Sequence, residues 1–299
     1  MALWIFATLF AASAQAIRFY LQKRLSTGGL SPVAATFARF VYAPVPIAVG
    51  LAAWAFTGDT ALPSLGDGFA GYAIVGGTAQ ILATVCVVAL FARRNFAVGI
   101  AFSKTAVLLT VVTGFLMLGE TVTWLALGAM AVGFAGVLLL SLPEGGGLRG
   151  NPFNVASLLG LAAGALFSVS AVSYRGASLL VETDLPLVRA AMTLCCVTLF
   201  QTVLLAAWLA WRDRAGLIAV FQRWRSTSLV GVTSLLGSLG WFTAYTLQTA
   251  SLVNAVGQIE LLLSMLISGL LLQERQTRRE LTGITLVGLS VVGLILLEA

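Results

Sequence analysis

The sequence predicts an all-α membrane protein, a polytopic bundle of ten transmembrane helices arranged as two inverted five-helix repeats. Three observations lead to this fold class. Apolar residues make up 59% of the 299 residues, charged residues only 9%, and the mean hydropathy is +1.00, which exceeds what a soluble domain hides in its core. Apolar stretches of about 20 residues, enough to cross a bilayer, recur along nearly the whole chain. The two halves also match each other at one constant offset.

The spans are bounded by turn residues such as those in STGGLSP. They cover residues 2–22, 32–56, 68–91, 96–118, 122–142, 153–176, 185–210, 227–248, 252–272 and 281–297. The first span lacks a basic leader and a small-residue cleavage site, so we expect a retained helix. Pro44 and Pro46 are expected to kink the second span. The longest polar connection is RDRAGLIAVFQRWRST, after the seventh span.

An ungapped offset of 154 residues aligns the predicted spans of the two halves. The matched pairs include Tyr20 with Tyr174, Pro32 with Pro186, Gly77 with Gly231, and Glu120 with Glu274. Residues 1–145 and 146–299 then hold five helices each. Because five is odd, the second repeat must be inverted relative to the first, as in many membrane transporters.

The short loops carry their cations mainly on one side of the predicted membrane. That side holds Lys23, Arg24, Arg93, Arg94, Arg149, Arg212, Arg214, Arg223, Arg225, Arg275, Arg278 and Arg279, and the other holds Arg175 and Arg189. This bias predicts that both termini lie outside the cytoplasm. A basic rim beside anionic lipid accounts for the net charge of +6, so no nucleic-acid partner is expected.

Few residues suit catalysis or metal binding. The chain has no histidine, and its four aspartates are predicted at helix ends. We therefore expect no catalytic residue, no metal site and no cofactor. The three cysteines (Cys86, Cys195 and Cys196) fall within spans and are expected to be packing residues.

Three segments carry a resemblance to a known family. They are FLMLGETVTWLALGAMAVGFAGVLLL, LLLQERQTRRELTGITLVGLSVVGLIL and SPVAATFARF. With them, nearly the whole chain resembles the drug/metabolite transporter superfamily, of the EamA-like ten-helix kind. The resemblance implies inverted repeats around a central substrate cavity that opens alternately to each side, in a bacterial cytoplasmic (inner) membrane. Many relatives keep both termini in the cytoplasm, whereas the charges here predict the reverse; we follow the charges.

Lys104 and Glu260 are charged residues inside the fourth and ninth predicted spans. The repeat offset pairs them with Gln258 and Ala106, so both should face the space between the two repeats. An unpaired charge at this depth costs at least about 2.5 kcal/mol. One interpretation is an ion pair that locks the repeats together. In the other, Lys104 receives a substrate carboxylate, and Glu260 an ammonium or a coupling proton.

Further polar residues complete the predicted substrate site. Arg18 and Arg39 either snorkel to the interface or line the cytoplasmic mouth of an anion path, and Gln15 shares a helix face with Arg18. Polar and aromatic residues at matching depth suit an organic solute, although Trp241 and Tyr245 could equally belong to the core or an interfacial belt. These residues are Gln80, Trp241, Tyr245, Asn254 and Gln258. Glu120 and Glu274 are instead expected to cap a turn or to pair with Arg275 or Arg278.

The sequence therefore favours a secondary active transporter for a small polar organic metabolite such as an amino acid or another carboxylate, and the resemblance implies that it is an exporter. Its expected partners are the substrate, the lipid bilayer, and protons or a counter-substrate for coupling. A monomer suffices, although small-residue stripes such as GAMAVGFAG also permit a dimer. The alternative is a membrane-embedded enzyme or flippase that acts on a lipid or isoprenoid.

Overall fold

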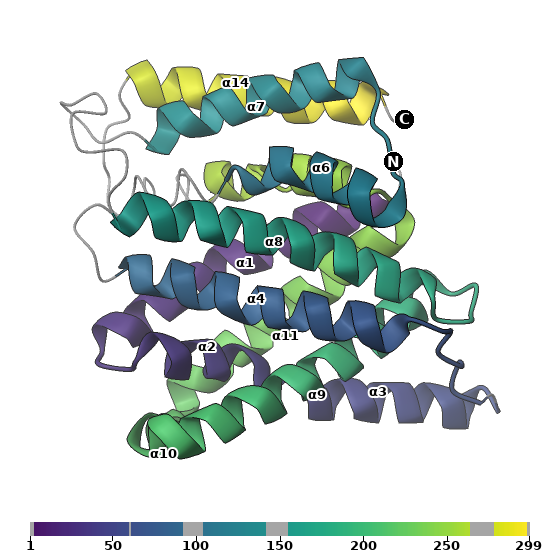
Figure 1. Ribbon diagram of the computed structural model, residues 1–299, viewed down its shortest axis with the longest axis vertical. Coiled ribbons are helices and arrows are strands. Elements are labelled where there is room, and N and C mark those ends of the chain that lie inside the picture. Colours follow the sequence, from purple (N-terminus) through teal and green to yellow (C-terminus); the bar gives the residue numbers. More distant parts are fainter. Residues whose placement is uncertain (1–2, 60, 92–103, 142–154, 264–277, 298–299) are drawn as a thin grey trace.

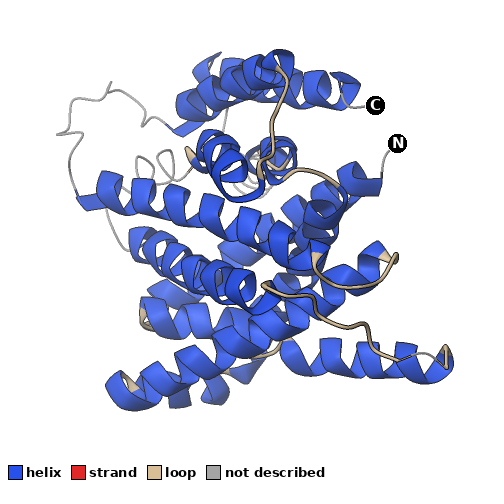
Figure 2. Cartoon of the chain, turned by 45° about the vertical axis from the view of Figure 1, so that its right-hand side comes forward, coloured by secondary structure: helices blue, strands red, loops and turns tan. Residues whose placement is uncertain are grey.

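The computed structural model describes residues 3–59, 61–91, 104–141, 155–263 and 278–297. Within these ranges the chain forms a helical bundle, and no β-sheet is present (Figures 1 and 2). The helices are α1 (Leu3–Thr27), α2 (Pro32–Phe40), α3 (Pro44–Thr57), α4 (Phe69–Phe91), α6 (Ala106–Leu118), α7 (Trp124–Ser141), α8 (Val155–Leu179), α9 (Pro186–Arg212), α10 (Arg214–Gln222), α11 (Trp224–Leu247), α12 (Ala250–Val256) and α14 (Arg278–Leu297). The all-α prediction is confirmed.

Among the residues that the structure describes, six helical segments are long and apolar enough to cross a membrane, which makes the chain a multi-pass membrane protein. They are Leu3–Ser26, Pro32–Thr57, Phe69–Leu90, Leu158–Leu179, Pro186–Arg212 and Trp224–Leu247, and each overlaps a predicted span. Shorter apolar helices cover Ala106–Leu118, Trp124–Leu139, Ala250–Leu263 and Leu281–Leu297. Parts of the predicted spans 96–118 and 252–272, and the boundary between residues 145 and 146, lie outside the described residues.

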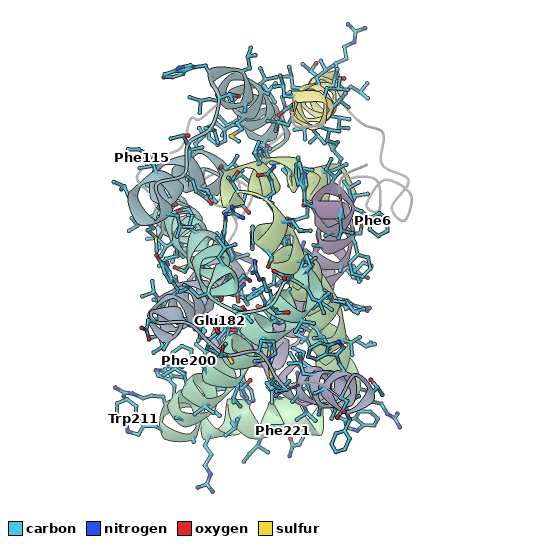
Figure 3. All side chains as sticks on the ribbon, turned by 90° about the vertical axis from the view of Figure 1, so that its right-hand side faces the viewer. Phe6, Phe115, Glu182, Phe200, Trp211 and Phe221 are labelled. Carbon is cyan, nitrogen blue, oxygen red and sulfur yellow. The ribbon has the colours of Figure 1, made fainter. Side chains whose placement is uncertain are left out.

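The outside of the bundle is apolar. Phe6, Phe115 and Trp211 project away from it (Figure 3), and each is more than half exposed. Many serine, threonine and glutamine side chains are buried instead, together with two arginines. This distribution suits a protein whose outer surface meets lipid tails and whose polar groups must find partners inside.

The second predicted span is broken rather than kinked. α2 ends at Phe40 and α3 begins at Pro44, with a turn between them. Pro44 and Pro46 have no N–H to bond to the carbonyls one turn earlier, so the α-helical ladder cannot continue through this point. The break leaves Arg39 in the last turn of α2.

The polar connection after the seventh span contains a helix that the sequence analysis missed. The Asp213 side chain caps α10 by accepting a hydrogen bond from the Gly216 N–H, and it also accepts one from the Ser31 hydroxyl at 2.7 Å. Phe221 of α10 packs edge-on against Phe37 of α2. The apolar run GLIAVF gives α10 its packing face, which the flanking arginines obscured.

Three helix pairs make the most extensive contacts: α4 with α8, α1 with α11, and α7 with α14. The last pair forms an outer layer at the top of Figure 1. The two helices approach closely at Gly136, which has no side chain. A Cβ there would lie only 2.8 Å from the Gly283 carbonyl oxygen. The small-residue stripe of α7 is thus used within the chain. α1 begins and α14 ends at the same end of the bundle, the right of Figure 1.

Candidate functional site

A cavity of about 290 Å³ lies among α1, α2, α4, α6, α8, α11 and α12. Nine of the ten predicted site residues line it: Gln15, Arg39, Gln80, Lys104, Trp241, Tyr245, Asn254, Gln258 and Glu260. Arg18 is not part of the lining. The volume is many times that of a water molecule, about 30 Å³, and close to the lower end of ligand pockets, about 300 Å³.

Two turns beside helices supply the most polar part of the lining. Lys104 and Thr105 form a turn before α6, and α12 ends at Val256 before a turn at Gly257 and Gln258. Helical geometry resumes after this second turn. Irregular backbone at membrane depth is tolerated where it lines a cavity.

The Lys104 ammonium and the Glu260 carboxylate form an ion pair, with Nζ and Oε2 3.6 Å apart. Gln15 Nε2 donates a hydrogen bond to the same oxygen at 2.6 Å. The Glu260 side chain is 5% exposed and that of Lys104 18%. In this conformation the two residues are therefore paired, as the structural interpretation expects. Both also line the cavity, so a bound solute could reach the pair.

A polar and aromatic wall continues from this pair. Gln15 Oε1 accepts a hydrogen bond from Trp241 Nε1 at 3.1 Å, and the Trp241 ring stacks on Tyr245 with centroids 5.9 Å apart. The Tyr245 hydroxyl donates to Asn254 Oδ1 at 2.7 Å. Asn254 Nδ2 in turn donates to the Thr110 hydroxyl at 2.9 Å. Trp241 and Tyr245 therefore line the cavity and do not form an interfacial belt.

Two residues beside Gln80 were missed by sequence reasoning, Tyr174 and Gln201. The Tyr174 hydroxyl donates to Gln80 Oε1 at 2.9 Å, and Gln201 Nε2 donates to the same oxygen at 3.0 Å. Tyr174 lines the cavity, whereas Gln201 lies behind Gln80 and is fully buried. Gln201 could have been predicted as a buried partner, because it is a glutamine within the apolar run CCVTLFQTVLL and buried amides in membrane helices need partners.

Arg18 and Arg39 are buried, with 2% and 3% of their surface exposed, so the snorkelling interpretation is wrong for both. Arg39 Nε donates to the Ser234 hydroxyl at 3.2 Å, and Nη1 donates to the Thr84 hydroxyl at 2.7 Å. Arg18 Nη1 donates to Gln22 Oε1. Among the described residues, neither guanidinium forms an ion pair with a carboxylate.

Glu120 pairs with Arg175, a partner that the sequence analysis did not predict, and it forms no ion pair with the described Arg278. Arg175 Nη1 also donates to the carbonyl oxygens of Tyr245 and Gln248, each at 2.7 Å. Arg175 thereby caps the last turn of α11, whose carbonyls have no helical partner. This partnership depends on the packing of α8 beside α11. Glu274 and Arg275 lie outside the described residues.

Arg175→Met is expected to lower the thermal unfolding midpoint more than Glu120→Gln. The first variant leaves two carbonyls and a half-buried carboxylate without their donor, at about 1–3 kcal/mol for each unsatisfied group. The second keeps an acceptor oxygen for Arg175. Thermal unfolding in detergent measures both, with Arg225→Met at the exposed start of α11 as a control that should change little. Equal effects of the two variants would contradict the capping role.

Gln258 is the least satisfied polar residue of the lining. It is 3% exposed, and neither its amide nitrogen nor its oxygen has a hydrogen-bond partner among the described residues. An unpaired buried amide is costly, and native proteins retain such groups where they have another use.

Gln258→Leu is expected to raise the unfolding midpoint and to weaken the binding of any solute that the cavity accepts. Leucine has nearly the same volume as glutamine but no unsatisfied amide, and removing that amide should stabilise the folded state by about 1–3 kcal/mol. Thermal unfolding without solute gives the first effect, and a solute titration gives the second. A variant that is less stable than the wild type would show that the amide already has a partner.

Metal chemistry receives no support from the part of the chain that the structure describes. No group of three or more acidic, cysteine or histidine side chains there could hold a metal ion. The three cysteines are free thiols.

Comparison with known proteins gives the fold alone. No family model matches the chain. No curated protein matches it either. Solved structures do match, and one, described only as a crystal structure of a protein, has a TM-score of 0.69 at 17% identity. That match covers 97% of this chain and 98% of the other, so the similarity extends over the whole bundle.

Proposed function

We propose that the chain is a secondary active transporter that exports a small polar organic metabolite, an amino acid or another carboxylate, across a bacterial cytoplasmic membrane. The observation that carries this proposal is the central cavity, which combines a Lys104–Glu260 ion pair with stacked aromatic rings and amides. Paired opposite charges suit a solute that carries ionised groups, and aromatic faces suit its organic part.

In this proposal the bundle has ten spans in two inverted repeats, with the cavity between them. The helix contacts support the repeat, because the pairs α4–α8 and α11–α1 are exchanged by the offset of 154 residues. The turns at Lys104–Thr105 and at Gly257–Gln258 also overlap under this offset, since Lys104 corresponds to Gln258. Together with the sequence resemblance, these features favour a member of the drug/metabolite transporter superfamily of the EamA-like kind.

The proposed orientation places both termini outside the cytoplasm. At the end of the bundle where α1 ends and α11 begins, the described cations are Lys23, Arg24, Arg212, Arg214, Arg223, Arg225, Arg278 and Arg279. At the opposite end Arg175 and Arg189 are outnumbered by Asp59, Asp67, Glu120, Glu182 and Asp184. The positive end is assigned to the cytoplasm.

The ion pair is proposed to open around the substrate. Glu260 keeps its hydrogen bond from Gln15 when Lys104 turns to a substrate carboxylate, so the acidic group is not left without a donor. Lys104 lies before α6 and Glu260 follows α12, so their separation loosens a link between the two halves of the chain. Such a link suits alternating access, in which the two repeats move relative to each other around a fixed site.

A thermal-shift screen of purified protein tests this function. The panel contains amino acids, organic acids, amines and nucleotide-type solutes, and it is repeated on Lys104→Met, with Lys23→Met on the basic rim as the matched control. We expect a carboxylate compound to stabilise the wild type and Lys23→Met but not Lys104→Met. Stabilisation of all three proteins by the same compound would make Lys104 a purely structural partner of Glu260. No stabilisation by any solute would contradict the proposed function.

A further inference from the structure

The buried charges around the cavity do not balance. Lys104 is neutralised by Glu260 at 3.6 Å, which leaves the guanidiniums of Arg18 and Arg39. Both are almost fully buried, and Arg18 is close enough for the charge of Arg39 to act on it. Within the described ranges they bond only to neutral groups. The charge of Glu260 acts on Arg18 as well as on Lys104, so the described site holds three cations and one carboxylate, and two positive charges remain in excess.

Arg39 is the member of this pair that faces the cavity. Ser234 and Thr84 hold its Nε and Nη1, and no hydrogen bond joins Nη2 to another described residue. Gln22 ties Arg18 to α2 by donating to the Ala35 carbonyl oxygen, one turn before Arg39. The guanidinium of Arg39 is thus fixed in orientation, and its Nη2 is not occupied by any described residue, which suits the planar recognition of a carboxylate.

The nearby hydroxyl groups cannot replace a counter-ion. They satisfy the hydrogen-bonding capacity of the two arginines in part but leave their charge uncompensated, and uncompensated buried charges in a membrane protein are costly. A zwitterionic amino acid would bring no net charge to the site. A solute with two negative charges would bring the sum of Arg18, Arg39, Lys104 and Glu260 to zero.

We propose that the transported solute is a dicarboxylate, with one carboxylate on Arg39 and the other on Lys104. The inference rests on the proposed function and narrows its substrate class. The two cations come from different elements of the lining, Arg39 from α2 and Lys104 from the turn before α6, so two separate anionic groups suit them better than one. The stacked Trp241 and Tyr245 rings border the space that the carbon chain would occupy.

The test compares each dicarboxylate with its own half-amide, which has nearly the same size and half the charge. Succinate, glutarate and adipate and their half-amides are titrated into the purified protein, with glycerol 3-phosphate as a dianion whose charges lie on one group. For one chain length we expect the dicarboxylate to bind about ten- to a hundredfold more tightly than its half-amide, the range of one charged hydrogen bond. Arg39→Gln is expected to reduce this ratio to about one, and Arg39→Lys to keep part of it.

The ratio separates recognition from folding, because a purely structural loss at Arg39 would weaken both ligands equally. An unchanged ratio in Arg39→Gln would overturn the proposal. Tighter binding of neutral amino acids, or of glycerol 3-phosphate, than of any dicarboxylate would also overturn it. Tighter binding of neutral amino acids would nevertheless leave the proposed function intact. Binding of no carboxylate at all would remove the proposed function as well.

Discussion

Glu260→Gln is expected to destabilise the protein by about 3–5 kcal/mol, the usual range when one partner of a buried ion pair is removed. Glu260 is buried, and it is the only carboxylate near Lys104, Arg39 and Arg18 among the described residues of the cavity. Without it, three cations share a poorly solvated space. Thermal or denaturant unfolding in detergent measures the loss, and transport should be lost with it.

Lys104→Met serves as the matched single variant and should cost less, because Glu260 keeps its hydrogen bond from Gln15. Combining Lys104→Met with Glu260→Gln should recover part of the stability lost in Glu260→Gln, with a coupling free energy of about 0.5–3 kcal/mol. If Glu260→Gln unfolds like the wild type, or the double variant recovers nothing, the ion pair contributes nothing to the fold.

Gly257→Ala is expected to destabilise the protein by about 1–3 kcal/mol and to abolish transport, because it overpacks the cavity wall. A Cβ at this position would overlap the Trp241 ring. The backbone itself accepts alanine, since φ is −61° and ψ is −14°. The penalty is therefore steric. A displaced Trp241 would lose its hydrogen bond to Gln15 and its stacking on Tyr245.

The control is Gly288→Ala in the interior of α14, where nothing lies within 4 Å of the added methyl group. That variant should match the wild type or gain about 0.5–1 kcal/mol from the higher helix propensity of alanine. Unfolding and transport are measured side by side. If Gly257→Ala behaves like Gly288→Ala, Trp241 has room to move and does not form a fixed wall.

Hydropathy predicted the helical bundle well, because lipid demands continuous apolar segments and leaves little freedom in where they occur. The same logic predicted most of the cavity. Polar residues such as Gln80 and Asn254 are conspicuous within apolar helices because each must find a partner or a water-filled space. The repeat offset predicted that Lys104 and Glu260 face the same central space, and Lys104 Nζ and Glu260 Oε2 lie within ion-pair distance.

Sequence reasoning failed where the partner was set by packing between helices distant in the chain. Arg175 was recognised only as a cation at a helix end, whereas it joins Glu120 to the last carbonyls of α11. Arg18 and Arg39 have aliphatic stems long enough to snorkel, and nothing in the sequence specifies the hydroxyls that hold Arg39 inside. The helix α10 was hidden because its arginine-rich flanks outweigh its short apolar face.

Counterflow in proteoliposomes tests the central claim most directly. Vesicles that contain the purified protein are loaded with a high concentration of one solute, and the entry of the same radiolabelled solute is followed. We predict transient accumulation for at least one carboxylate, absent from protein-free vesicles and lost in Lys104→Met but retained in Lys23→Met. A folded protein that moves none of the amino acids and organic acids in the panel would contradict the assignment of the cavity to transport.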